Sequence, residues 1–217
     1  LQGYPNQQLT QLGDSAFDLL VIDYSFDGSD EGQFTPEEIS DLKHSPGGEK
    51  LVLAYMSIGE AEDYRWYWQP EWATTPPSWL GPENPDWPGN FKVRYWDAGW
   101  QELIIGGGQV KSYLERIVES GFDGVYLDII DAYEFFGPDG NNERPTAEED
   151  MVSFVLAIAQ RGRELSGPDF LVFPQNAPEL VLHSDYLAGI SGVGKEDTFY
   201  NDDDPQDAQT IEEATFF

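Results

Sequence analysis

The chain has 217 residues, enough for one domain with a substantial core, and we expect a single domain over residues 1–217. Its 41 acidic residues against 11 Lys and Arg give a formal net charge of −30, which excludes nucleic acid and anionic membrane as expected partners. The lack of Cys excludes disulfides and thiol chemistry, and no apolar run is long enough to predict a membrane span.

The first half of the chain alternates short apolar runs with a helical pattern. Residues 18–24 and 50–57 are predicted strands, and the nearly continuous apolarity of the second is typical of a strand covered on both faces. Thr-Pro-Glu-Glu at residues 35–38 predicts a helix start with a capping box. Residues 60–92 form a long insertion rich in aromatic residues and Pro, and connections of this length are usually functional or lids.

The second half continues the alternation of strands and helices. Three consecutive glycines at residues 106–108 should break or kink one helix. Thr146 and Glu149 predict another capping box, and Asp204 predicts the N-cap of a last helix. The predicted strands are residues 91–96, 124–129, 170–175 and 186–191, and the predicted helices are residues 100–120, 146–165 and 178–183.

Repeated strand–helix units predict an α/β fold with a parallel sheet, either doubly wound or closed as a barrel. The chain lacks the G-x-G-x-x-G fingerprint of a nucleotide-binding sheet. The opening LQGY could end one further strand, and another could lie beyond residue 217. This arithmetic favours an eight-stranded (β/α)8 TIM barrel that is trimmed at both ends.

Acidic residues follow most of the apolar runs. In a strand–helix barrel, the C-terminal ends of the strands share one mouth, so Asp23, Glu60, Asp128 and Glu196 are candidates for a common site. If Tyr126 points into the barrel, Asp128 does too, because side chains alternate along a strand. Structural roles remain open: Asp23 could cap a turn, Asp128 could bond a loop backbone, and Glu60 could pair with Arg65 or bind substrate.

Amides and aromatic rings accompany these acids. Gln175 and Asn176 follow a strand, where amides suit sugar hydroxyls but could equally tie down a Pro-flanked turn. Aromatic faces stack on sugar rings, and we expect a few tryptophans to touch ligand while the others pack the insertion. The candidates are Trp66, Trp68, Trp72, Trp79, Trp87 and Trp96.

Other chemistries find little support in the sequence. His44 and His183 stand alone, and residues 201–204 lack the spacing of an EF-hand loop, so we expect no metal site and no cofactor. A G-x-S-x-G nucleophile elbow is missing. Two carboxylates whose pKa values are pushed apart, beside aromatic rings, are the equipment of a glycoside hydrolase.

Five stretches of the chain carry a resemblance to a known protein family: FDLLVIDYS, LVLAYMSIGEAEDYR, VRYWDAGWQ, GFDGVYLDIIDAYE and FPQNAPELV. With these in order, the chain resembles glycoside hydrolase family 114, the endo-α-1,4-polygalactosaminidase-like barrels. The resemblance implies a (β/α)8 barrel that hydrolyses α-1,4-linked galactosamine polymers, usually outside the cell. It implies that the paired catalytic carboxylates are Asp128 and Glu196, with Asp197 as a one-residue alternative to Glu196. The subsites would then be lined by Asp23, Tyr55, Glu60, Arg65, Trp96, Gln175 and Asn176.

Several alternatives stay open at this point. Asp128 is favoured as nucleophile or transition-state stabiliser and Glu196 as acid/base, but the sequence does not fix that order. The acidic composition fits a halophilic surface solvated by carboxylates, attraction of a cationic amino-sugar polymer, or both. A catalytically silent carbohydrate-binding barrel and a hydrolase of another glycan are the alternative functions.

Overall fold

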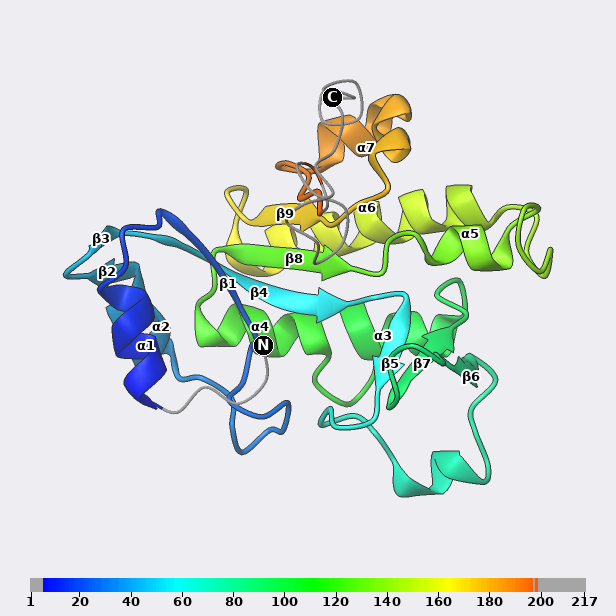
Figure 1. Cartoon of the computed structure of the whole chain (residues 1–217), viewed down its shortest axis with the longest axis horizontal. Helices are drawn as coiled ribbons and strands as arrows, with labels where there is room; N and C mark the ends of the chain where they lie inside the picture. The colour runs from blue at the N-terminus through cyan, green and yellow to red at the C-terminus, as the bar shows by residue number, and fades with distance from the viewer. Residues whose placement is uncertain (1–5, 197, 199–217) are drawn as a thin grey trace, which may run out of the picture.

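The computed structural model describes residues 6–196 and 198. Within this range the central sheet is parallel, with the strand order β1–β4–β8–β9 (Figure 1). Tyr55 on β4 is in register with Tyr126 on β8, which in turn is in register with Phe173 on β9. The strands are β1 (Leu19–Ile22), β4 (Leu51–Ser57), β8 (Gly124–Asp128) and β9 (Leu171–Pro174), which confirms four of the predicted strands.

The two faces of this sheet differ in burial because side chains alternate along each strand. Tyr55, Tyr126 and Asp128 share the face that is only half-buried. The other face is apolar and closed to solvent. Against it pack the helices α2 (Pro36–Lys43) on β4, α4 (Tyr113–Ser120) on β8 and α6 (Ala147–Ser166) on β9. Its fully buried members include Val52, Ala54, Met56, Val125, Leu127 and Val172.

Local signals explain most helix ends. The predicted capping box at Thr35 and Glu38 is present at the start of α2. The glycines at 106–108 separate two helices, and Gly106 has φ +95°, which favours glycine. The helices are α1 (Asn6–Gly13), α2 (Pro36–Lys43), α3 (Ala98–Ile105), α4 (Tyr113–Ser120), α5 (Ala132–Phe136), α6 (Ala147–Ser166) and α7 (Ser184–Gly189), with 3-10 turns η1 (Pro70–Ala73) and η2 (Pro178–Leu182).

The predicted capping box of Thr146 and Glu149 is wrong. Thr146 is the N-cap of α6, but its side chain makes no capping hydrogen bond. Its hydroxyl instead donates to Asp150 Oδ2 at 2.9 Å, and Arg144 pairs with the same carboxylate at 2.6 Å. The Thr146 hydroxyl therefore bonds to Asp150, one residue beyond Glu149, and does not cap the helix backbone.

The long insertion folds into a small antiparallel sheet of its own. Within the described chain its order is β5–β7–β6, and ring contacts such as Trp68–Phe91 at 4.8 Å and Trp72–Trp79 at 5.0 Å pack it. The predicted strand at 91–96 is present in part as β7, but it belongs to this antiparallel sheet and not to the parallel one, where β8 pairs directly with β4. The strands are β5 (Glu60–Glu62), β6 (Leu80–Glu83) and β7 (Asn90–Val93); a separate hairpin joins β2 (His44–Ser45) and β3 (Gly48–Glu49).

The predicted strand at 186–191 is wrong. These residues belong mainly to α7, whose sequence SDYLAG has no β-branched residue. The extended segment begins at Ser191, whose N–H donates to Val172 O at 2.8 Å, and continues to a parallel bridge between Gln175 and Gly194. Glycines in this segment hide its extended conformation from the sequence pattern. The helix predicted at Asp204 lies outside the described residues.

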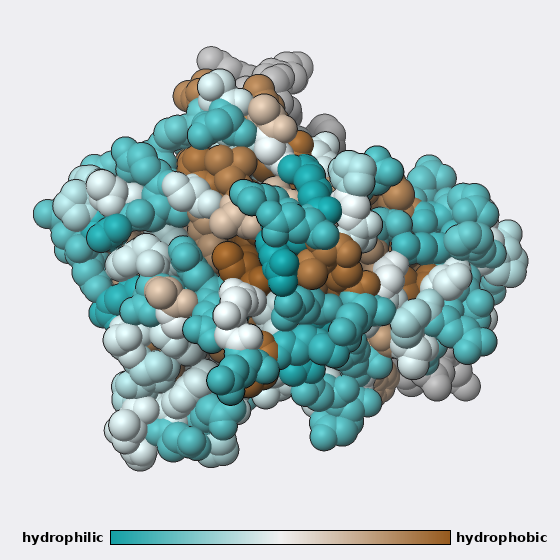
Figure 2. All heavy atoms as spheres, turned by 180° about the vertical axis from the view of Figure 1, so that it is seen from behind, coloured by the Kyte–Doolittle hydropathy of each residue, from teal (hydrophilic) through white to brown (hydrophobic). Residues whose placement is uncertain are grey.

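The α/β class with a parallel central sheet is confirmed, with four of the described strands paired side by side. Seen from the side opposite to Figure 1, hydrophilic residues cover most of the surface and apolar residues gather near its middle (Figure 2). Among the described helices, none is both long and apolar enough to cross a membrane.

Candidate active site

A cavity of about 730 Å³ opens where β1, β4 and β8 end. Such a volume suits a small-molecule or sugar site. The insertion supplies one wall, and the segment that follows β9 supplies another. Of the residues proposed from sequence, it brings together Asp23, Tyr55, Glu60, Arg65, Asp128, Gln175, Asn176 and Glu196.

Asp128 sits at the end of β8 and is held by two donors. The Tyr55 hydroxyl donates to Asp128 Oδ2 at 2.5 Å, and the backbone N–H of Ile129 donates to Oδ1 at 2.8 Å. Ile129 has φ +57°, a strained conformation for a β-branched residue, in the turn that follows Asp128. Burial raises the pKa of Asp128 above its ordinary value, although the two hydrogen bonds oppose that shift.

The turn after Asp128 also needs a glycine on the neighbouring strand end. A Cβ on Gly59 would lie 2.2 Å from the carbonyl oxygen of Ile129, so a side chain there would collide with the backbone. The amide N–H of Ile58 donates to the backbone oxygen of Asp128 at 3.1 Å. The sequence SIGE therefore supports the position of Asp128 from the adjacent strand.

Glu196 reaches the same cavity from the segment after α7. Its carboxylate accepts a hydrogen bond from Asn176 Nδ2 at 3.1 Å, and its N–H donates to Asn176 Oδ1 at 3.0 Å. Asn176 has φ +60°, and its own N–H donates to Gly194 O at 2.7 Å. The amide of Asn176 therefore positions Glu196. The glutamate side chain itself is exposed.

Tyr126 connects the two carboxylates. Burial, together with the nearby charges of Glu196 and Asp128, raises the pKa of Tyr126 to about 12. A Cβ on Gly194 would lie only 2.1 Å from the Tyr126 hydroxyl oxygen. Glycine at this position therefore lets the segment that carries Glu196 approach β8. The two predicted catalytic residues therefore face one region of the cavity.

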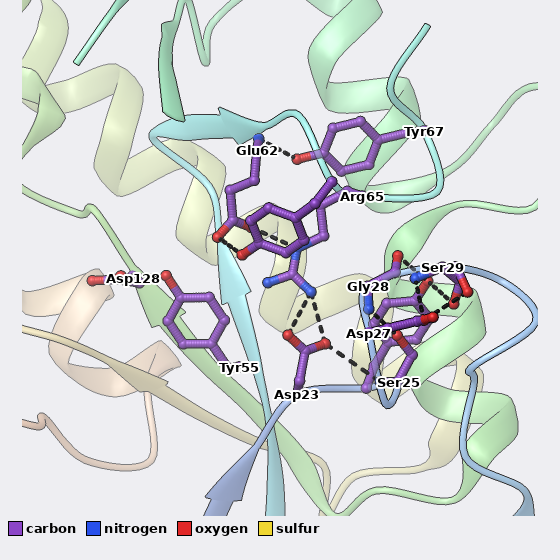
Figure 3. A network of polar contacts seen from close by, with 12 residues as sticks. Asp23, Ser25, Asp27, Gly28, Ser29, Tyr55, Glu62, Arg65, Tyr67 and Asp128 are labelled. Atoms are coloured by element: carbon purple, nitrogen blue, oxygen red, sulfur yellow. Dashed lines mark hydrogen bonds and ion pairs between the residues drawn. The ribbon is translucent and has the colours of Figure 1, made fainter. Parts of the chain in front are cut away.

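A buried ion network forms the floor beside Asp128 (Figure 3). Arg65 Nη1 contacts both carboxylate oxygens of Asp23, at 2.7 and 2.6 Å, and Arg65 Nε donates to Glu62 Oε2 at 2.6 Å. The guanidinium also lies 5.8 Å from the ring centre of Tyr55, within cation–π range. Arg65 and Asp23 thus serve as a scaffold for the wall from which Tyr55 projects.

The sequence left open whether Glu60 pairs with Arg65 or binds substrate. The pairing is wrong, because Arg65 binds Glu62 instead. Glu60 is 1% exposed and accepts hydrogen bonds from Asn84 Nδ2 at 2.8 Å and from Lys92 Nζ at 3.4 Å. These partners lie on or next to β6 and β7, because the insertion folds back over β5. Glu60 therefore anchors the insertion while it lines the cavity.

Sequence reasoning misplaced one residue and missed several. The Trp96 ring lies outside this cavity and packs edge-on against Phe136 at 4.9 Å. Strand alternation could have identified Tyr126, which lies two residues before Asp128. The EAEDYR stretch contains Glu62 and Tyr64, and Asp131 follows Asp128 by three residues. The polar and aromatic cavity residues outside the predicted site set include Glu62, Tyr64, Asn90, Tyr126 and Asp131, and Trp87 is one of the six tryptophan candidates. Asp197, the alternative to Glu196, lies outside the described residues.

Comparison with known proteins identifies the family of the chain. The model of glycoside-hydrolase family GH114 matches residues 6–213. Proteins described only as uncharacterized are similar: one of Methanocaldococcus jannaschii is 40% identical over 96% of this chain, and one of Thermotoga maritima is 41% identical over 90%. The chain spans 58% of the length of each of these relatives.

Solved structures show the same fold. The glycoside hydrolase domain of PelA from Pseudomonas aeruginosa superposes with a TM-score of 0.62 at 17% identity, covering 89% of this chain and 64% of that domain. A glutamate-to-alanine variant of that domain gives a TM-score of 0.61 at 15% identity, covering 90% of this chain and 64% of its own. At this level of identity the likeness confirms the barrel fold class.

Proposed function

Because the chain belongs to glycoside hydrolase family 114, we propose that it hydrolyses glycosidic bonds with Asp128 and Glu196. One observation carries the proposal: two carboxylates far apart in sequence line a single cavity at the C-terminal ends of the parallel strands. Glycosidases need such a pair across the scissile bond, with one carboxyl group to protonate the leaving oxygen.

The surroundings of the two carboxylates support a division of roles. Asp128 is fixed by Tyr55 and Ile129, as befits a group that must meet the anomeric carbon in one orientation. Glu196 is exposed, so it can exchange protons with solvent between steps of the reaction. Asp128 is therefore the nucleophile or transition-state stabiliser, and Glu196 is the acid/base.

Charge supports an amino-sugar polymer as substrate. The cavity is lined by six carboxylates, including Glu62 and Asp131, and by one guanidinium, that of Arg65. A polymer of α-1,4-linked galactosamine carries protonated amines, which this excess of negative charge attracts. The same reasoning extends to the whole chain, whose net charge of −30 fits a secreted enzyme that works on a cationic polymer or in high salt.

The test is release of reducing ends from deacetylated galactosaminogalactan. Asp128→Asn and Glu196→Gln should each lower turnover by about 10²-fold or more, while Asp169→Asn should leave it unchanged. Asp169 is the matched control because it is exposed and lies at the opposite end of β9. Wild-type turnover in either of the first two variants would refute the assignment.

A panel of other polymers separates the proposal from its alternatives. Cleavage of a glycan without free amines, at a higher rate than galactosamine polymer, would identify a hydrolase of another glycan. Binding of the polymer by the wild-type protein without any release of reducing ends would identify a carbohydrate-binding barrel. Sodium azide should restore chain cleavage to Asp128→Ala if this residue is the nucleophile, because the smaller side chain leaves room for the anion to attack the anomeric carbon. The product is then a glycosyl azide, and the leaving oxygen departs with a proton from the acid.

A further inference from the structure

Trp87 differs from the other tryptophans of the insertion. Trp66, Trp68 and Trp72 are packed against the core, and Trp79 is buried in it. The side chain of Trp87 is 68% exposed, and among the described tryptophans it is the one that lines the cavity of Asp128. An apolar ring of this size in contact with both solvent and a polar cavity needs an explanation in terms of a ligand.

The turn that carries Trp87 is held by hydrogen bonds. It connects β6 to β7, and the backbone oxygen of Trp87 accepts from Asn90 N–H at 3.0 Å. The side chains of Asn84 and Glu83 accept from the N–H groups of Asp86 and Gly89, at 3.1 and 2.8 Å. Pro88 further restricts the backbone next to the indole. Binding to this ring therefore requires little ordering of the loop.

The position of Trp87 relates it to a long substrate. Its neighbours in the cavity wall include Glu60 and Asn90 of the insertion, whereas Asn176 and Glu196 belong to the wall after β9. Trp87 and Glu196 therefore belong to different walls, so a polysaccharide that spans the cavity can contact the indole with a sugar unit other than the one at Glu196. The face of a pyranose ring is apolar and fits the flat face of an indole.

We propose that Trp87 is the platform of a distal sugar subsite, on which a sugar unit stacks away from the bond that is cleaved. The proposal rests on the glycosidase function above and adds a preference for longer chains. The stacked unit contributes binding free energy that short oligosaccharides cannot reach.

The experiment measures binding of α-1,4-linked galactosamine oligosaccharides of increasing length by calorimetry, in the Asp128→Asn background so that the ligands persist. Trp87→Ala should weaken binding of long oligosaccharides about three- to tenfold, as expected for loss of one aromatic contact. Binding of the shortest should not change. Trp87→Phe should retain most of the affinity, and Leu182→Ala, at another exposed apolar residue outside this cavity, should retain all of it.

Equal affinity of Trp87→Ala and its parent for every length would overturn the subsite. This outcome is distinct from failure of the proposed function. If the wild-type protein does not cleave the polymer but Trp87→Ala still weakens binding of long chains, the subsite stands and the hydrolase does not. If the polymer is cleaved and Trp87→Ala binds normally, the hydrolase stands and the subsite does not.

Discussion

The hydroxyl of Tyr55 donates a hydrogen bond to Asp128 Oδ2 at 2.5 Å, across two neighbouring parallel strands. The register of β4 and β8 makes this contact possible, because Ser57 is opposite Asp128 and Tyr55 lies two residues earlier on the same face. Burial raises the pKa of Asp128, and the Tyr55 hydroxyl acts against that rise. The ionisation of the proposed nucleophile therefore depends on its neighbour.

Tyr55→Phe should lower kcat/KM by about ten- to a hundredfold, because a hydrogen bond to a charged group contributes about 1.5–3 kcal/mol. Loss of the donor should also raise the pKa of Asp128, so the acidic limb of the pH–rate profile should move to higher pH. Kinetics measured from pH 4 to 8 would check both effects. An unchanged acidic limb would show that Tyr55 does not control the ionisation of Asp128.

Asp128→Asn should stabilise the protein at neutral pH even though it removes activity. The folded-state pKa of Asp128 is raised, so this carboxyl group binds its proton more tightly in the folded state than in the unfolded state. Its contribution to stability is then greatest below the unfolded value of about 4 and is lost as pH rises through the folded value. The Tm of the variant should exceed that of the wild type at pH 7, and the gap should close towards pH 4.

Arg65→Met should destabilise the protein by about 3–5 kcal/mol, because it leaves the buried carboxylates of Asp23 and Glu62 without their cation. Adding Asp23→Asn and Glu62→Gln to this variant should recover part of the loss. Urea unfolding of the wild type, Arg65→Met, the Asp23→Asn/Glu62→Gln pair and the triple variant measures the coupling between the cation and its two carboxylates. A triple variant that is less stable than Arg65→Met would contradict the ion network as the source of the effect.

Asn176→Gly and Asn176→Ala together separate positioning from backbone strain. Both remove the amide that holds Glu196, so both should lower kcat about tenfold, the effect of losing roughly 1.4 kcal/mol of hydrogen bonding. Asn176 has φ +60°, which glycine accepts and alanine does not, so the alanine variant alone should lose about 1 kcal/mol of stability. Equal activity in the wild type and the glycine variant would remove Asn176 from the site.

The repeated pattern of short apolar runs and helical segments determined the fold class. Strands β1, β4, β8 and β9 each carry enough apolar residues to be identified locally, and Thr35 with Glu38 marks the start of α2 by chemistry contained within one turn. Asp128 was identifiable for the same reason, because an acid at the end of a buried strand is unusual. These features depend on residues close together in the chain.

Tertiary contacts decided the rest. The sequence alone could not show that Arg65 pairs with Glu62 and Asp23 instead of Glu60, because the choice depends on how β5 leaves the sheet. Nor could it show that residues 186–189 belong to a helix and that the extended segment begins only at Ser191, since Gly192 and Gly194 of that segment lie against Phe173 and Tyr126 of other strands. Trp87 stands apart from the other tryptophans of the insertion only because the folded insertion buries its neighbours and leaves its ring at the cavity. Local propensity sets which elements form, whereas packing between distant segments sets which side chains meet.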